Sequence, residues 1–302
     1  MKDTILYGDC RETLKQFAAS GIRARTCVTS PPYYGLRDYG NETNQIGLEE
    51  SPEEFIAQLV EVFRGVRDVL TDDGTLWVNI GDSYYNYRSG KGQALPKQSV
   101  ASNNQDLPQI RNPRRGNKLE GLKDKDLIGI PWMLAFALRA DGWYLRQDII
   151  WSKPNPMPES MKDRCTKSHE YIFLLSKSKN YYFDVDAIKE PTVDQSALKR
   201  KRSVWEVTTK PYKGAHFAVY PTELIEPCIL AGSEEGDIVL DPFMGSGTTA
   251  AVAKLHKRHY IGCELHKDYE DLIGQRIKVF SESVPVDEVA HSMNNPLAAA
   301  LY

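Results

Sequence analysis

The stretch Ile238–Thr249, which reads IVLDPFMGSGTT, decides the fold of this chain. Its first residues are apolar and predict a short buried strand that ends at Asp241. A Gly-Ser-Gly loop follows, and the run TTAAVAKL after it has the apolar spacing of a helix. A strand, a glycine-rich loop and a helix N-terminus in this order predict an α/β unit whose loop cradles a nucleotide-like ligand.

The spacing of the glycines excludes two common nucleotide-binding loops. No Lys follows the glycines, so the loop is not a P-loop. No third glycine stands two residues on, so it is not the dinucleotide fingerprint. The next apolar run, 260–263, ends in Glu264, about one βαβ repeat after Asp241. A carboxylate at the tip of that strand suits a ribose diol, because it can accept both hydroxyl protons.

A second motif lies near the N-terminus, where the β-favouring run 24–29 is followed by Ser30-Pro31-Pro32-Tyr33. The prolines fix the backbone and carry no N–H groups. The turn therefore offers a hydroxyl (Ser30), two bare carbonyls and an aromatic face. These groups suit an exocyclic NH2 group on a flat ring, since the oxygens accept its protons and Tyr33 stacks on the ring.

Both motifs together resemble the amino-group DNA methyltransferases, which move a methyl group from S-adenosylmethionine (AdoMet) to an exocyclic nitrogen of cytosine or adenine. The catalytic motif precedes the cofactor motif, which is similar to the circularly permuted β class. This resemblance implies an α/β, Rossmann-like fold with a mixed, mostly parallel seven-stranded sheet and small target-recognition insertions. It also implies that Ser30, Pro31, Pro32 and Tyr33 are catalytic.

The resemblance implies an AdoMet site made of several segments. Tyr7-Gly8-Asp9 matches the segment whose Asp contacts the adenine, and 216–221 matches the segment that closes over the methionine end. The implied cofactor-binding residues are Asp9, Thr29, His216, Pro221, Asp241, Pro242, Phe243, Gly245, Ser246, Gly247, Thr248, Thr249 and Glu264. No metal is implied.

Charge is distributed unevenly along the chain. The net charge is −3, yet residues 88–125 carry nine bases and 199–202 read KRKR. Such runs favour contact with the phosphates of double-stranded DNA, although a solvated face or a linker is the alternative. The predicted DNA contacts in these runs are Arg114, Arg115, Lys199, Arg200, Lys201 and Arg202. The resemblance adds Lys153, since its segment matches the one beside the target-base pocket, where Lys153 would contact the flipped base or its phosphate.

Composition indicates an ordinary globular protein, with 302 residues and 41% hydrophobic residues. The sequence shows neither a signal peptide nor a membrane span, and its five cysteines form no C-x-x-C pair. We therefore expect reduced thiols and a cytoplasmic location in a bacterial, archaeal or phage-infected cell. Cys228 lies in the helical pattern 223–231, which makes it a core residue and excludes carbon methylation by a cysteine nucleophile.

Motif order predicts the organisation of the chain. The expected parts are a catalytic half (1–85), a basic insert (86–125), a continuation of the methyltransferase domain (126–183), a target-recognition region (184–212), an AdoMet-binding half (213–283) and a tail (284–302). Periodicity predicts helices over 9–19, 52–70, 130–140, 223–231 and 248–255. It predicts strands over 2–6, 24–29, 75–80, 144–151, 170–176, 181–183, 238–240 and 260–263.

We predict methylation of the N4 atom of cytosine in duplex DNA after base flipping. Within the family, Ser at the first motif position is more frequent in cytosine-N4 enzymes, whereas Asp or Asn is more frequent in adenine-N6 enzymes. Adenine-N6 methylation stays the main alternative. An RNA or protein amine methyltransferase and a non-catalytic binding module are further ones. A cognate restriction endonuclease is a candidate partner, and monomer and homodimer are both open.

Overall fold

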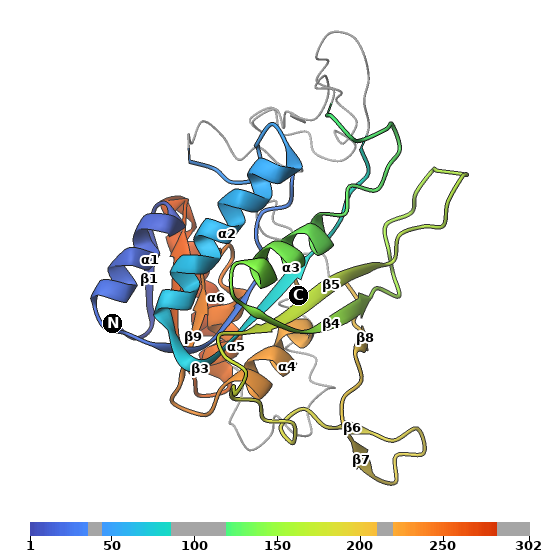
Figure 1. The fold of residues 1–302 in the computed structure, drawn as a ribbon. Coiled ribbons are helices and arrows are strands. Elements are labelled where there is room, and N and C mark those ends of the chain that lie inside the picture. The colour runs from blue at the N-terminus through green and yellow to red at the C-terminus, as the bar shows by residue number, and fades with distance from the viewer. Residues whose placement is uncertain (36–43, 86–118, 210–219, 283–302) are drawn as a thin grey trace.

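The structure is a computed structural model that describes residues 1–35, 44–85, 119–209 and 220–282. Its centre is one twisted sheet with helices on both faces (Figure 1). In the described part of the chain, this sheet has eight strands, in the spatial order β1 (Thr4–Tyr7), β10 (His259–Glu264), β9 (Ile238–Asp241), β2 (Ala24–Thr29), β3 (Leu70–Ile80), β5 (His169–Ser176), β4 (Tyr144–Ser152) and β8 (Val204–Glu206).

The sheet is mixed and mostly parallel, as predicted. The five strands from β1 to β3 run parallel to one another. β5 is antiparallel to both β3 and β4, and β8 is parallel to β4. The resemblance implied a seven-stranded sheet, and the short strand β8, which was not predicted, adds an eighth strand. A separate hairpin is formed by β6 (Glu190–Pro191) and β7 (Leu198–Lys199). The residues 181–183, predicted as a strand, are not one; Phe183 instead stacks on Trp77 at a centroid distance of 6.1 Å.

Six helices form the outer layers in the described residues. One layer contains α1 (Cys10–Ala19), α2 (Pro52–Val69) and α3 (Ile130–Ala140), and the other contains α4 (Thr222–Gly232), α5 (Thr248–Leu255) and α6 (Glu270–Glu282), which follows the 3-10 turn η1 (Lys267–Tyr269) (Figure 1). Separate apolar clusters fill the two interfaces between helices and sheet. The molecule is therefore a three-layer α/β protein. None of the described helices is long and apolar enough to cross a membrane.

Local sequence explains where α2 begins and which face of α4 is buried. Ser51 and Glu54 form the capping box that begins α2, and Pro52 occupies its first turn. In α4, the side chain of Cys228 is 1% exposed and packs in the core, as the helical pattern predicts. Both helices press their apolar faces onto the sheet, which leaves the strand ends to the loops.

The carboxyl ends of neighbouring parallel strands meet at one edge of the sheet. β9 lies between β10 and β2, so the loops after these three strands are adjacent although the sequence separates them widely. In open α/β sheets this edge is where ligands bind, particularly where the chain changes direction across the sheet. The two motifs therefore meet at the place where the fold favours a site.

Candidate active site

The buried carboxylate of Asp241 joins the two motifs. It accepts hydrogen bonds from Thr29 Oγ1 at 2.6 Å, Thr249 Oγ1 at 2.6 Å, the Phe243 backbone N–H at 3.0 Å and the Tyr220 hydroxyl at 3.1 Å. Burial raises the pKa of Asp241, while these four donors oppose the rise. The hydrogen bonds to this carboxylate thus come from the protein itself, and through them Asp241 connects the end of β2 to the glycine loop.

The glycine loop has the geometry of a ligand cradle. Gly247 caps α5 with φ at +82°, and a Cβ atom there would lie 2.8 Å from Ile273 Cγ2. Gly245 also has a positive φ, but a Cβ atom there would meet only the Phe243 carbonyl, at 3.8 Å. Open space therefore adjoins Gly245, and a ligand can approach the backbone at this point.

Glu264 lies at the tip of β10, beside this loop. Its Oε2 accepts from the Gly245 N–H at 2.8 Å and its Oε1 from the His266 N–H at 3.0 Å. Burial raises the pKa of the carboxyl to about 7. Each oxygen keeps a further lone pair, so the side chain can accept from a ribose diol. A nucleoside fits these donors and acceptors.

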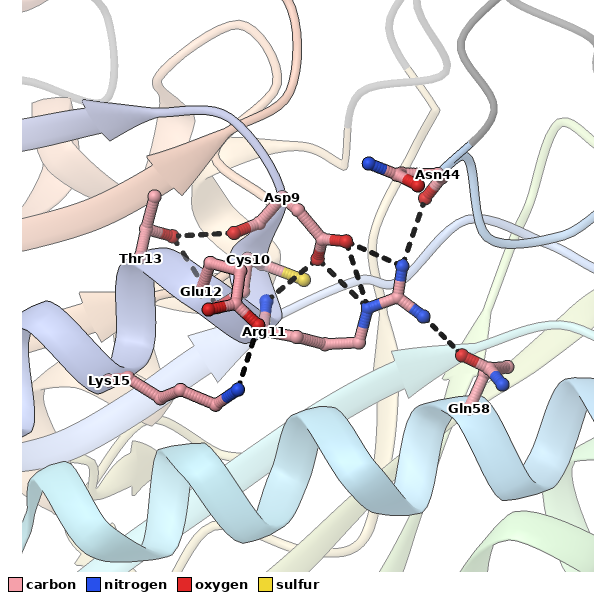
Figure 2. Close-up of polar contacts among 8 residues, drawn as sticks. All are labelled: Asp9, Cys10, Arg11, Glu12, Thr13, Lys15, Asn44 and Gln58. Atoms are coloured by element: carbon pink, nitrogen blue, oxygen red, sulfur yellow. Dashed lines mark hydrogen bonds and ion pairs between the residues drawn. The ribbon is translucent and has the colours of Figure 1, made fainter.

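Asp9 begins α1 next to the same strand end, because Gly8 N–H donates to the Glu264 carbonyl at 2.8 Å. Its carboxylate accepts from the Arg11 backbone N–H at 2.9 Å and pairs with the guanidinium at 2.6 Å (Figure 2). Burial would raise the pKa of Asp9, but the contacts with Arg11 bring it below its ordinary value. Arg11, which the sequence analysis missed, also reaches Gln58 and the carbonyl of Asn44 (Figure 2).

The Ser30–Tyr33 turn follows β2 directly. The hydroxyl of Tyr33 donates to Glu170 Oε2 at 2.6 Å and lies 3.4 Å from Asn79 Oδ1. Its environment, burial first and the Glu170 carboxylate second, raises the pKa of Tyr33 well above the ordinary value. Neither Asn79 nor Glu170 was identified from the sequence, because each looks like an ordinary residue of a buried strand.

The remaining predicted cofactor residues lie around the cradle where they are described. Pro221 stands at the start of α4 and Pro242 in the loop, both buried. Ser246 Oγ accepts from Arg276 Nη1 at 2.6 Å and lies 3.5 Å from the Thr248 hydroxyl. His216, Arg114 and Arg115 fall outside the described residues.

The predicted DNA-contact residues do not form one cluster. Lys153 follows β4 and pairs with Glu170. Residues 199–202 precede β8. Because β8 runs parallel to β4, they lie at the opposite end of this strand pair from Lys153. Both Lys199 and Arg202 pair with Glu190, at 3.7 and 3.4 Å. In the same segment, Lys201 lies over the Trp205 ring and Arg200 is exposed.

Lys167, in the segment between β4 and β5, has a buried amine. Its Nζ atom is shielded from solvent and has no hydrogen-bond partner among the described residues. Burial lowers the pKa of this lysine, against the opposing pull of Asp82 and Glu170. No sequence pattern marks this residue, since a lysine beside a hairpin normally extends into solvent.

The structure is a Rossmann-like fold in which the glycine loop and the Ser30–Tyr33 turn lie at one sheet edge, joined through Asp241. A family model described as DNA methylase matches residues 24–275, and the chain belongs to this N6/N4 DNA methylase family. The type II methyltransferase M.Cfr9I of Citrobacter freundii is 50% identical over 280 residues, which cover 91% of this chain and 87% of that protein. The predicted family is therefore confirmed.

Solved structures share the fold. The PvuII DNA methyltransferase, described as cytosine-N4-specific, matches with a TM-score of 0.63 at 17% identity, covering 96% of this chain and 90% of that one. A putative DNA modification methylase of Thermus thermophilus, solved in complex with S-adenosyl-L-methionine, matches with a TM-score of 0.61 at 24% identity, covering 93% and 95%. The predicted fold class is confirmed, and AdoMet is the cofactor of the family.

Proposed function

We propose that this DNA methylase is site-specific and methylates the exocyclic N4 atom of cytosine in duplex DNA. The observation that carries the proposal is the hydrogen bond between Thr29 and Asp241, which joins the amine-binding turn to the nucleoside cradle. Ser30 in the first position of the turn favours cytosine-N4 over adenine-N6. A structural relative described as cytosine-N4-specific supports the same choice.

The turn supplies what the target amine needs. The amine lone pair is delocalised into the base ring, so the nitrogen is a poor nucleophile. The Ser30 hydroxyl and the Pro31 carbonyl accept hydrogen bonds from its two N–H groups and favour a pyramidal nitrogen, which frees the lone pair for in-line attack. The methylated nitrogen then releases one of these protons to solvent. Tyr33 stacks on the base, which is flipped out of the duplex to reach the turn.

The cradle orients the cofactor for this attack. AdoMet, when bound, supplies the electrophilic methyl group. Glu264 accepts from the ribose, Gly245 permits close approach of the ligand, and Asp9 lies where the adenine is expected. Asp241 acts through the protein, because its hydrogen bonds to Thr29 and Thr249 fix the distance between turn and loop.

DNA phosphates are the proposed partners of the cations in the two basic runs. We assign this contact to Arg114 and Arg115 and to residues 199–202, in which Arg200 extends into solvent. The region 184–212 carries the β6–β7 hairpin and β8 and is the proposed target-recognition region. We place the protein in the cytoplasm, where such DNA is found and free cysteines persist.

Nucleoside mass spectrometry tests this function. Unmethylated duplex DNA of diverse sequence is incubated with the protein and AdoMet, then digested to nucleosides. N4-methylcytosine is the expected product. N6-methyladenine would overturn the base assignment, and the absence of any methylated base, with AdoMet binding verified by calorimetry, would overturn DNA as the substrate.

The Tyr33→Ala variant is the control for this assay. Its ring is expected to contact the base and not the cofactor, so methyl transfer falls at least about a hundredfold while AdoMet affinity is retained. Full turnover by Tyr33→Ala would remove the catalytic role from the turn.

A further inference from the structure

We infer that Glu170, held by Lys153, is a positioning residue that sets the orientation of the Tyr33 ring. The inference rests on the proposed function, in which that ring stacks on the target base. Glu170 lies where three strand ends meet, because it pairs across the sheet with Trp151 of β4 and its neighbour Tyr171 pairs with Ile80 of β3. The turn after β2 brings Tyr33 to the same place.

Both oxygens of Glu170 are engaged. Oε2 accepts from the Tyr33 hydroxyl at 2.6 Å and lies 3.4 Å from Asn79 Nδ2. Oε1 pairs with the ammonium group of Lys153, which also lies 4.1 Å from the centre of the Trp151 ring. Hydrogen bonds to a charged acceptor are stronger and shorter than neutral ones, so this carboxylate fixes the phenol well.

The ion pair is largely removed from solvent. The side chains of Lys153 and Glu170 are 17% and 16% exposed. Taking two charges out of water is unfavourable, and a pair of apolar residues would often stabilise such a place as well or better. Stability alone therefore does not explain the Lys153–Glu170 pair. The hydrogen bond from the Tyr33 hydroxyl to Glu170 gives it a role in orienting Tyr33.

The edge of the Tyr33 ring next to the hydroxyl is also confined. A Cβ atom on Gly81 would lie 2.8 Å from Tyr33 Cε2 and 3.3 Å from the Glu170 side chain. The hydroxyl and one ring edge are thus held by the protein, which restricts rotation of the ring. A small rotation of this ring would move a stacked base relative to the methyl donor, and such displacements slow methyl transfer strongly.

This assignment changes the role expected for Lys153. The sequence predicted contact with the flipped base or with a phosphate. In the structure its charge is matched by Glu170, so it acts on the base through Glu170 and Tyr33. Removing either member of the pair leaves the other with an unmatched charge.

A double-mutant cycle on single-turnover methylation tests the inference. At saturating AdoMet and DNA, Tyr33→Phe and Glu170→Gln should each slow methyl transfer about tenfold, the effect expected from losing one charged hydrogen bond. The double variant should be no slower than either single one, because both remove the same interaction. Additive losses, or full rates in both single variants, would overturn the inference.

The matched control is Glu226→Gln. Glu226 pairs with His256 at 2.7 Å between α4 and α5, in the opposite helix layer. This change removes a half-buried ion pair without touching the turn, so the rate should be unchanged. AdoMet affinity should be unchanged in all variants, since a general structural defect would weaken it along with the rate.

Titration of Tyr33 gives a readout that needs neither DNA nor turnover. With 13C-labelled tyrosine, the Tyr33 signal is assigned by its loss in Tyr33→Phe. In the wild-type protein it should titrate well above pH 10, as the raised pKa of Tyr33 requires, and at a lower pH in Glu170→Gln, which removes the negative charge beside the phenol. Titration near pH 10 in the wild type would overturn the contact. If the titration supports the Tyr33–Glu170 hydrogen bond but no DNA is methylated, the proposed function is wrong although the contact is present.

Discussion

At the scale of single residues, Asp241 explains why two distant motifs act as one site. Its carboxylate holds Thr29 and Thr249, which the sequence separates by most of the chain. Buried carboxylates are tolerated when several donors surround them, and Tyr220 and the Phe243 N–H complete this set. The geometry of methyl transfer thus depends on a side chain that contacts neither the base nor the reacting methyl group in our proposal.

We predict that Gly247→Ala destabilises the protein by about 1 to 3 kcal/mol. The residue has φ at +82°, and the new Cβ atom would press on Ile273. Urea unfolding measures the change. The matched control is Gly274→Ala in the same contact region, where a Cβ atom has no neighbour within 4 Å and a helix should gain up to about 1 kcal/mol. Equal changes in the free energy of unfolding for the two substitutions would show that the backbone at Gly247 is not strained by a side chain.

The raised pKa of Glu264 predicts a specific pH dependence of stability. The folded protein binds the carboxyl proton more tightly than the unfolded chain does, so the free energy of unfolding falls as pH rises from the ordinary pKa of 4.5 to the folded value of about 7. Glu264→Gln cannot titrate and should lack this loss, which is on the order of 3 kcal/mol.

Urea unfolding at pH 4, 6 and 8 compares the two proteins. Glu12→Gln, which removes a carboxylate with 65% side-chain exposure, is the control and should follow the wild-type pH curve. If the free energy of unfolding depended on pH in the same way in the wild type and in Glu264→Gln, the pKa of Glu264 would not be raised by burial.

At the scale of helices and strands, the sequence predicted those element bounds that are set by residues close together in the chain. The helix over 130–140 and the strand over 24–29 have the predicted bounds, since apolar spacing and turn residues define them. The resemblance also implied that the two motifs serve one site, and the structure brings them to the same sheet edge. It did not predict β8, nor the pairing of Tyr33 with Glu170. These depend on sheet register and on contacts between residues far apart in the chain.

β8 gives the proposed recognition region its attachment to the sheet. Trp205, in the middle of β8, is 5% exposed and donates its indole N–H to the Arg202 carbonyl at 2.6 Å. We predict that Trp205→Ala loosens this attachment, lowers stability by about 3 kcal/mol and weakens DNA binding at least about tenfold. AdoMet affinity should change less than twofold, since the cradle lies at the other side of the sheet.

Fluorescence anisotropy for DNA and calorimetry for AdoMet separate these effects. Val204→Ala is the control, because this neighbour is 61% exposed and should lose neither property. If Trp205→Ala retained its DNA affinity, the recognition region would have to lie elsewhere in the chain.

At the scale of the whole molecule, the order of strands in space compensates for the permuted order of motifs in sequence. The N-terminal strand β1 pairs with β10, near the end of the described chain, and Asp3 extends this junction by contacting His259 and Lys254 at 3.0 and 3.2 Å. The segment proposed to contact the adenine and the carboxylate proposed to bind the ribose, Glu264, are thereby neighbours. A permuted chain can therefore build the same ligand cradle, since the sheet order and not the chain order sets the site.

The same packing predicts the reactivity of the five cysteines, all of which lie in the described residues. Cys165 is exposed, whereas Cys10, Cys27, Cys228 and Cys263 are buried. Burial raises the pKa values of these four thiols, that of Cys10 to about 12, so little thiolate is present at pH 8.

A thiol reagent such as dithionitrobenzoate should therefore modify one thiol per molecule quickly and the other four only after unfolding. Cys165→Ser should abolish the fast reaction. Cys228→Ser should retain both the fast reaction and methyl transfer, because the proposed mechanism uses no cysteine nucleophile. A second fast thiol in the native protein would mean that one of the two helix layers opens, and loss of methyl transfer in Cys228→Ser with the fold intact would reinstate a cysteine in the chemistry.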